Sequence, residues 1–185
     1  MTKENTPALT AVTTSPRRQE LLRRIFPGVV FIPPQYSEKK RRHSFTPVLL
    51  SLYHAYQKLK SAGKQADTAV AFDTIVYRDF RIYSKPETAG DVREILRALK
   101  NKTHKVVTGI AIKKKRRVYF SCAVTKVTFK DLSRTEIRDY AESSLWPGKA
   151  GGYGIQDIGN DLIKEYKGDY FNVMGVPLYL LRSLK

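Results

Sequence analysis

Hydrophobic and polar residues alternate along this chain in blocks that predict strands and helices in turn. Apolar runs of four or more residues, each bounded by polar residues or prolines, are typical of β-strands. One run is interrupted only by Asp73 and Thr74, and such a nearly continuous run favours a strand that is covered on both faces. The strands expected on this basis span residues 9–12, 29–32, 69–77, 104–112 and 118–129.

Between these strands, apolar residues recur three and four positions apart, which predicts amphipathic helices. A serine or threonine precedes four of these helices, at Ser15, Thr46, Thr88 and Ser133, and Ser133 and Glu136 form a capping box. A glycine-rich loop at 148–154 is expected to lead into a helix through Lys164. The other expected helices run from 16, from 47 to about 62, from 88, from 133 to about 143, and from 176 or 177.

Helices and strands alternate without any internal repeat, which favours the α/β class: a three-layer domain around an elongated, mixed β-sheet. A chain of 185 residues has the length of one domain of ordinary size. We therefore expect a flexible N-terminus at residues 1–8, followed by a single domain over residues 9–185.

The charge of the chain limits the kinds of partner that it can attract. Lysine and arginine outnumber acidic residues by 34 to 17, which gives a formal net charge of +17. Such a chain attracts nucleic acid or phosphorylated small molecules. Two runs, Lys39–Arg42 and Lys113–Arg117, supply much of the excess. The second run is most simply a solvated hairpin turn between two strands, and the first lies in a loop. Either run fits a nucleic-acid patch or a solvated surface.

Other residue types exclude whole classes of function. The single cysteine, Cys122, excludes an internal disulfide and a cysteine-based zinc cluster, and the three histidines show no ligand spacing. No apolar run approaches the ~20 residues of a membrane helix, and the N-terminus carries no apolar signal core. The expectation is a cytoplasmic location, in a reducing compartment, without a membrane partner.

Two segments are the first candidates for chemistry. Ser15, Arg17 and Arg18 open the first helix, where free backbone N–H groups and guanidinium forks favour a phosphate. An ordinary capped helix with a solvated basic first turn is the alternative. Asp73 is a carboxylate inside an apolar strand, which is costly unless it is partnered. It is either a metal ligand or general base, or a buried carboxylate that caps a neighbouring loop.

Two later segments carry weaker signals. Lys85, held in front of Pro86, can serve as a point charge for phosphate or can be an ordinary loop lysine. The glycines between Lys149 and Gln156 allow a close approach of the backbone to a ligand. There Lys149 could reach phosphate and the Gln156 amide could pair with a base edge, whereas the alternative is a flexible turn.

Taken together, these segments resemble the Maf family of nucleoside triphosphate pyrophosphatases, and the resemblance covers almost the whole chain from Leu9. The segments that carry it occur in one order: Ser15-Pro16-Arg17-Arg18-x-Glu20-Leu21-Leu22, Asp73-Thr74, Lys85-Pro86, Thr103-His104-x-Val106-x-Thr108-Gly109, Lys149-Ala150-Gly151-x-Tyr153-Gly154-Ile155-Gln156 and Gly168-Asp169-Tyr170-x-Asn172-Val173-Met174-Gly175.

The resemblance implies a Maf/ITPase-like fold, with an elongated mixed sheet flanked by helices and a cleft between two lobes. It implies hydrolysis of a nucleoside triphosphate to the monophosphate and pyrophosphate with a divalent metal, Mg²⁺ or Mn²⁺. A homodimer is the partner that the family often forms, and nucleic acid is not favoured.

By the same resemblance, each candidate residue acquires a role. Ser15, Arg17 and Arg18 would grip phosphates, and Asp73 would orient or deprotonate the attacking water. Lys58 would lie near the substrate. The combination of Arg17, Lys58 and Gln156 resembles the branch that acts on dTTP and UTP. The remaining roles are charge neutralisation by Lys85, phosphate contact by Lys149 and recognition of the base by Gln156.

The sequence departs from the family where an acidic pair usually follows the second strand. Here Ser37 and Glu38 stand at that place, and basic residues follow at once. Glu38 would then substitute as the second catalytic and metal-binding carboxylate beside Asp73. The alternative is a catalytically weak or inactive Maf-like regulator that binds nucleotides or nucleic acid.

Overall fold

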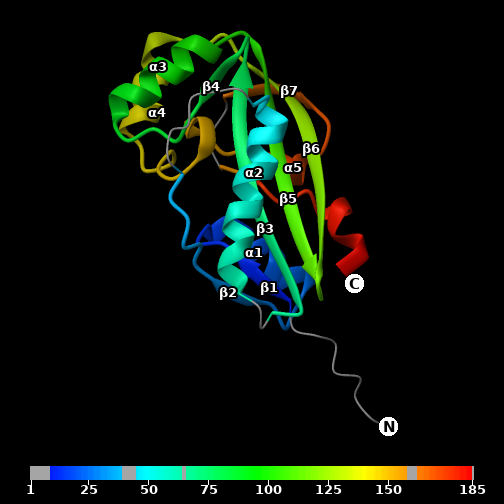
Figure 1. Ribbon diagram of the computed structural model, residues 1–185. Helices are drawn as coiled ribbons and strands as arrows, with labels where there is room; N and C mark the ends of the chain where they lie inside the picture. Colours follow the sequence, from blue (N-terminus) through cyan, green and yellow to red (C-terminus); the bar gives the residue numbers. More distant parts are fainter. Residues whose placement is uncertain (1–8, 39–44, 64–65, 158–161, 185) are drawn as a thin grey trace. The chain divides into compact units, whose positions relative to one another are not determined.

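The structure is a computed structural model that describes residues 9–38, 45–63, 66–157 and 162–184. A seven-stranded mixed sheet is the centre of the fold, with the order β2-β1-β3-β5-β6-β7 and with β4 paired to β3 (Figure 1). β1 is parallel to β2 and β3, whereas β4 and β7 run antiparallel to β3 and β6. The strands are β1 (Thr10–Val12), β2 (Val30–Ile32), β3 (Thr68–Arg78), β4 (Arg81–Tyr83), β5 (Thr103–Lys114), β6 (Arg117–Phe129) and β7 (Ile163–Lys167).

Helices flank this sheet, so the mixed α/β class expected from the sequence is confirmed. Thr46 accepts a hydrogen bond from the Leu49 N–H at the start of α2, and capping boxes start α3 and α4. The helices are α1 (Pro16–Ile25), α2 (Pro47–Leu59), α3 (Ala89–Leu99), α4 (Arg134–Glu142) and α5 (Tyr170–Val173), and short 3₁₀ segments follow at η1 (Lys60–Ala62), η2 (Ala150–Gly152) and η3 (Leu178–Leu184).

The expectation of a helix after the glycine-rich loop is wrong. Residues 163–167 instead form β7, which pairs with the end of β6. These five residues are mostly polar and exposed and show no clear strand period, so it is pairing to β6, which satisfies their backbone groups, that makes them a strand. Residues 158–161, where the expected helix would have continued, lie outside the described residues.

Two elements were not expected from the sequence. β4 forms a hairpin with β3 through Asp79 and Phe80, which both have positive φ values. This turn lacks the Asn-Gly or Asp-Gly signal that usually marks such a hairpin. α5 is a single turn in which the Asp169 side chain accepts a hydrogen bond from the Phe171 N–H.

The chain divides into two compact units: residues 1–73 with 109–122, and residues 74–108 with 123–185. In the second unit, α3 and α4 lie side by side and bury apolar side chains against β5 and β6 (Figure 1). The core of that unit includes Leu96, Leu99, Val127, Phe129 and Ile137.

In the first unit, α2 packs closely on the sheet because the residues between them are small. Ala55 of α2 meets Ala69 and Ala71 of β3 and Ala111 of β5 in one buried cluster. A Cβ on Gly109 of β5 would lie 2.6 Å from the backbone of α2. The absence of a side chain at that glycine therefore sets how near the helix can come to the sheet.

The structure describes only one of the two basic runs. Lys113–Arg117 forms the turn between β5 and β6, as expected. Lys39–Arg42 lies outside the described residues. No helix within the described ranges is long and apolar enough to cross a membrane.

Candidate active site

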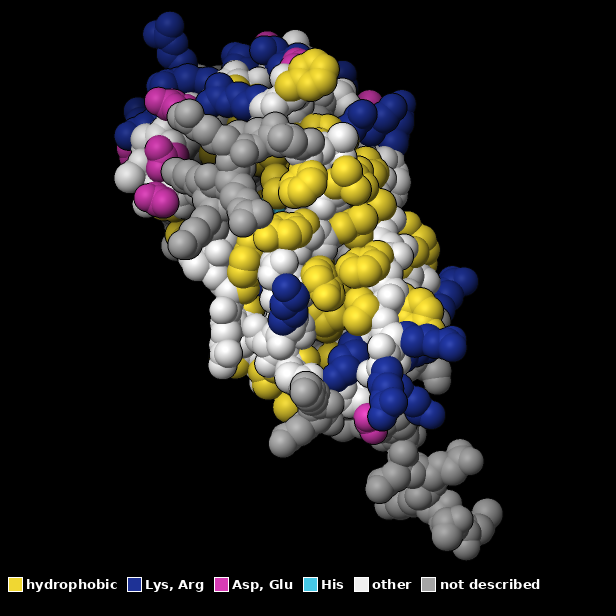
Figure 2. Space-filling view, in the orientation of Figure 1, with side chains coloured by type: hydrophobic (Ala, Val, Ile, Leu, Met, Phe, Trp, Pro, Cys, Tyr) yellow, Lys and Arg dark blue, Asp and Glu magenta, His cyan; other side chains and the backbone are white. Residues whose placement is uncertain are grey.

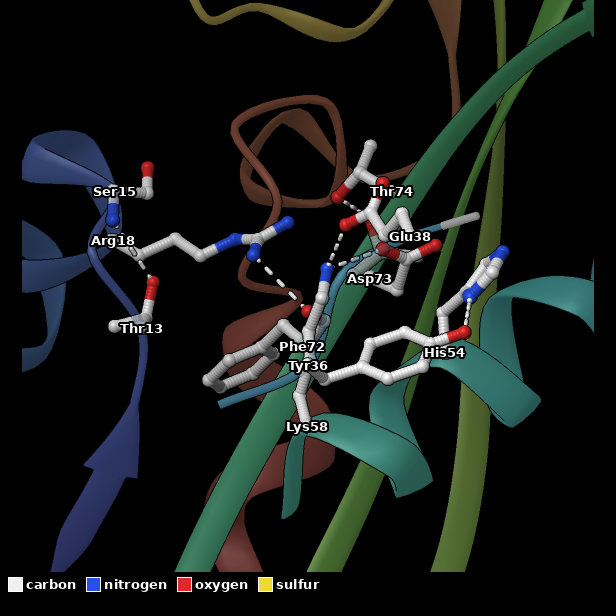
Figure 3. A network of polar contacts seen from close by, with 11 residues as sticks. Thr13, Ser15, Arg18, Tyr36, Glu38, His54, Lys58, Phe72, Asp73 and Thr74 are labelled. Atoms are coloured by element: carbon white, nitrogen blue, oxygen red, sulfur yellow. Dashed lines mark hydrogen bonds and ion pairs between the residues drawn. The ribbon is translucent and has the colours of Figure 1, made fainter. Parts of the chain in front are cut away.

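An acid–lysine–acid cluster lies in the first unit, and two of its three members, Lys58 and Asp73, are almost closed to solvent. The Lys58 side chain of α2 is 9% exposed and that of Asp73 on β3 is 6% exposed. Lys58 Nζ lies 2.6 Å from Asp73 Oδ1 and 2.5 Å from Glu38 Oε1 (Figure 3). One ammonium therefore bridges two carboxylates, and the cluster has one negative charge left over when both acids are ionised.

The electrostatics of this cluster are set mainly by burial. Burial raises the pKa of Asp73, because the charged carboxylate loses its hydration. The neighbouring Glu38 carboxylate adds to the rise in the Asp73 pKa, whereas the Lys58 ammonium opposes it. Asp73 is therefore a more basic carboxylate than an exposed aspartate, which suits a group that takes a proton.

Arg18 brings a second cation to the same strand. Its guanidinium Nη1 donates to the backbone carbonyl of Phe72 at 3.1 Å, and its charge acts on Asp73. Burial lowers the Arg18 pKa, but an arginine remains protonated in proteins. Arg17 lies close enough to affect the same guanidinium electrostatically. The structure thus places Arg18 near Asp73, and Arg17 next to Arg18.

The start of α1 differs in detail from the expectation. The helix begins at Pro16, but the Ser15 side chain makes no capping hydrogen bond to the described residues. The Ser15 backbone N–H instead donates to the Thr13 hydroxyl at 3.1 Å. A serine hydroxyl that does not cap its own helix can serve another acceptor or donor near the arginines.

The remaining sequence candidates belong to the second unit, where two of their segments touch. The Gly151 N–H donates to the Ser84 carbonyl at 3.3 Å, and a Cβ on Gly152 would lie 3.2 Å from Pro86. The exposed Lys85 is therefore next to the glycine turn that carries Lys149 and Gln156.

Lys149 is paired inside this unit. Its ammonium contacts both oxygens of Asp157, and the two side chains are only 11% and 8% exposed. Gly154 leaves room for that carboxylate, since a Cβ there would lie 2.8 Å from its oxygens. The Gln156 side-chain oxygen is buried without a hydrogen-bond partner among the described residues.

Sequence reasoning missed three polar residues of these sites: Tyr36, His54 and Asp157. The Tyr36 hydroxyl lies 2.9 Å from His54 Nδ1 (Figure 3). His54 precedes Lys58 by four residues, about one helical turn. That spacing could have predicted that both side chains lie on the same face of the helix. Tyr36 and Asp157 lie outside helices and strands, where no periodic pattern marks a partner.

The residues present fit a small divalent cation. No group of three or more metal-ligating side chains occurs among the described residues. Asp73 and Glu38 nevertheless approach the same ammonium from two sides. Mg²⁺ binds through one or two carboxylates together with waters and substrate phosphates, so a pair of carboxylates is a sufficient protein contribution.

A mixed α/β fold with paired arginines beside a buried carboxylate–lysine cluster is typical of proteins that handle phosphate esters and anhydrides. Residues 11–184 match the family model described as Maf-like protein, and the chain belongs to the Maf family.

Relatives that are named for an activity match nearly the whole length of this chain. The chain is 35% identical over 172 residues to a protein of Pyrococcus furiosus named dTTP/UTP pyrophosphatase, covering 93% of this chain and 90% of that protein. It is 38% identical over 181 residues to the dTTP/UTP pyrophosphatase of Caulobacter vibrioides, covering 94% and 91%. A solved Ham1 protein of Staphylococcus aureus is a more distant similarity, with 14% identity and a TM-score of 0.48 over 67% of this chain and 72% of that one.

Proposed function

We propose that this protein is a metal-dependent nucleoside triphosphate pyrophosphatase that hydrolyses dTTP and UTP, and modified pyrimidine triphosphates, to the monophosphate and pyrophosphate. The observation that carries the proposal is the Asp73–Lys58–Glu38 cluster, in which Asp73 and Lys58 are buried and beside which Arg18 of α1 lies. Membership of the Maf family and the names of the relatives support the same reaction.

In this proposal the start of α1 holds the phosphate chain. A triphosphate brings about four negative charges, and guanidinium groups bind phosphate oxygens through paired N–H bonds. Arg18 is already oriented by its bond to the Phe72 carbonyl, and Arg17 precedes it on the same turn. The positive end of the α1 helix dipole and the Ser15 hydroxyl add to the attraction for phosphate.

Asp73 is the proposed proton acceptor. A water oxygen forms the new bond to the α-phosphorus, the bond from that phosphorus to the bridging oxygen breaks, and pyrophosphate leaves. The proton of the water passes to the Asp73 carboxylate, whose raised pKa favours its acceptance. Lys58 keeps the carboxylate in place and limits its protonation before the reaction.

Asp73 and Glu38 are the proposed ligands of Mg²⁺ or Mn²⁺, together with phosphate oxygens. When bound, the cation would neutralise charge on the phosphates and on the departing pyrophosphate. Glu38 is the more accessible of the two, with a side chain that is 40% exposed, so it can move between Lys58 and a cation.

Gln156, Lys85 and Lys149 belong to the second unit, and we propose roles for them in line with the family resemblance. The Gln156 oxygen, which lacks a described hydrogen-bond partner, would accept the imide N–H of thymine or uracil. Lys85 is exposed and would neutralise phosphate charge directly. Because Lys149 is engaged by Asp157, we propose that it contributes to substrate binding by holding the glycine turn in place.

A second copy of the chain is the proposed partner. Phe45, Leu49 and Phe120 of the first unit are each about half exposed, and Figure 2 shows hydrophobic side chains gathered over α2. Contiguous exposed apolar patches mark interaction sites. Light scattering of the purified protein, with Phe120→Lys as the variant, tests for a dimer. A cytoplasmic location is proposed because nucleoside triphosphates are made and used there.

The experiment is a comparison of nucleotides with product identification. Purified protein is incubated with dTTP, UTP, GTP or ATP and with Mg²⁺ or Mn²⁺, and both pyrophosphate and monophosphate are quantified. The proposal expects equal amounts of the two products, with dTTP and UTP preferred. Release of inorganic phosphate and a nucleoside diphosphate, or no turnover of any nucleotide, would refute it.

Asp73→Asn tests the role of the carboxylate in the same assay. It keeps the size of the side chain but cannot accept the proton, and losses of 10²-fold or more are expected when a general base is removed. Asp67→Asn is the matched control, since Asp67 is exposed just before β3. Full activity of Asp73→Asn would remove this residue from the mechanism.

A further inference from the structure

The segment that carries Glu38 has no helix or strand to hold it. It leaves β2 at Ile32, passes two prolines and reaches Glu38 as irregular chain. An irregular exposed segment gains order only through contacts that repay its lost conformational entropy. Glu38 nevertheless lies with its carboxylate 2.5 Å from the Lys58 ammonium. The contacts that order this segment therefore bear on the site.

Hydrogen bonds attach the segment to α2, the helix that carries Lys58, and to η1, which follows it. The Gln35 backbone N–H donates to the Ser61 hydroxyl of η1 at 2.8 Å. The Tyr36 hydroxyl lies 2.9 Å from His54 Nδ1, in the middle of α2. Glu38 follows Tyr36 by two residues, so this second bond fixes the chain close to the carboxylate.

His54 is itself held in a fixed orientation. It is buried, the Tyr36 ring packs against it with the ring centroids 5.7 Å apart, and the Tyr53 ring meets it edge-on at 5.8 Å. Phe45 in turn packs on Tyr53 at 5.9 Å. A buried histidine fixed in this way presents its Nδ1 atom at a set position, one helical turn before Lys58.

We propose that Tyr36 and His54 are positioning residues for the reaction: their hydrogen bond holds the irregular segment on α2, so that Glu38 is presented to Lys58 and to the divalent cation. This inference rests on the proposed function for its catalytic consequence. The geometric part, in which the bond orders Glu38, does not depend on which nucleotide is hydrolysed. The competing explanation is a packing contact that contributes to stability alone.

Tyr36→Phe is the sharpest variant, because it removes one hydroxyl and keeps the ring that packs on His54. We expect kcat/KM for dTTP to fall about tenfold, with most of the loss in kcat, as befits the loss of one buried hydrogen bond. Mn²⁺ affinity in the nucleotide-free protein should fall by a similar factor. Tyr56→Phe is the matched control, since it deletes the same atom on α2 next to Phe120 and should change neither quantity.

A double-variant cycle separates positioning from stability. If Tyr36 acts through Glu38, Tyr36→Phe should have no further effect on kcat/KM or on Mn²⁺ affinity once Glu38→Gln is present. A loss that is equally large in both backgrounds would overturn the proposal. His54→Asn keeps a polar atom for the Tyr36 hydroxyl and should retain most activity, whereas His54→Leu should match Tyr36→Phe.

Amide hydrogen exchange gives a measurement that needs no substrate. In the nucleotide-free protein, Tyr36→Phe should speed exchange several-fold in the peptide that spans residues 33–38 and leave α3 and α4 unchanged. Unchanged exchange in that peptide, together with unchanged Mn²⁺ affinity, would refute the proposal. If the wild-type protein released no pyrophosphate, the proposed function would fail, while the exchange and Mn²⁺ results would still decide the role of Tyr36.

Discussion

Two buried lysines of this protein, one in each unit, pair with carboxylates that differ in their exposure to solvent. Lys58 bridges Asp73 and Glu38, and the Glu38 side chain is 40% exposed. Lys149 contacts both oxygens of Asp157, and both of these side chains are nearly closed to solvent. The first lysine therefore has an acid partner that a cation or a proton can reach from solvent, whereas the Asp157 carboxylate is buried with the second lysine.

The comparison teaches that a buried lysine in a phosphate-handling protein need not touch the phosphate. Burying one charge without a partner is expensive, so each lysine has a structural reason for its partner. What separates a reactive cluster from a structural pair is an acid partner of the lysine that stays accessible to solvent. Two predictions test this distinction, and a third concerns a buried histidine of the second unit.

The largest effect is expected for Lys58→Met. Removal of this ammonium takes away the cation that bridges Asp73 and Glu38, which raises the pKa of Asp73 further. We expect kcat/KM to fall by 10²-fold or more, and the free energy of unfolding to fall by about 3 kcal/mol. Steady-state kinetics and urea unfolding measure the two quantities. Lys60→Met, at an exposed lysine on the same helix end, is the control. Equal behaviour of the two variants would show that the cluster is not reactive.

A smaller effect, on stability rather than chemistry, is expected for the second pair. Lys149→Met alone should cost about 3 kcal/mol, because Asp157 is then left buried and unpaired. The double variant Lys149→Met/Asp157→Leu should recover most of that loss, with KM for dTTP within a few-fold of the wild type. A KM that stays tenfold higher after stability has recovered would mean that Lys149 binds the phosphate itself.

The third prediction concerns His104, a neutral side chain in the core of the second unit. Its effect on the free energy of unfolding, taken over one pH unit, is the smallest of the three. Burial lowers the pKa of His104 to about 3, and its Nε2 lies 2.6 Å from the Tyr153 hydroxyl. Between the ordinary histidine pKa of about 6.5 and 3, the unfolded chain binds a proton that the folded chain does not. Stability should therefore fall as the pH falls through this range.

The slope attributable to His104 approaches about 1.4 kcal/mol per pH unit. Urea unfolding at several pH values, compared between the wild type and His104→Gln, measures it. The variant cannot titrate at this position and should show a shallower dependence below pH 6.5. Parallel curves for the two proteins would contradict the assignment.

Much of the fold follows from local sequence signals. Prolines and capping residues set the starts of α1, α2, α3 and α4, and long apolar runs marked β3, β5 and β6. The errors lie where pairing across the sheet decides the structure. β7 is short and mostly exposed, so its partner β6, rather than its own periodicity, makes residues 163–167 a strand. β4 depends in the same way on the β3–β4 turn.

The residues of the candidate site also differ in how far the sequence alone could reveal them. Asp73 was recognisable because a carboxylate in an apolar strand demands a partner. Lys58 became a candidate only through the family resemblance, since its side chain reaches Asp73 across two packed elements. The partner of Lys149 was hidden because the glycine turn, and not a helical or strand period, brings Asp157 back to it. The roles of the site residues in catalysis remain predictions.

Gly109 has a consequence for how this protein can change over time. Its hydrogen atom is what separates β5 from the backbone of α2, the helix that brings Lys58 to Asp73. Even a methyl group there would push the lysine-bearing layer outward and lengthen the distance across which the ammonium must reach. The geometry of the reactive cluster thus depends on a residue of a neighbouring strand that contacts neither acid. A mutation of Gly109 during evolution would therefore reduce activity.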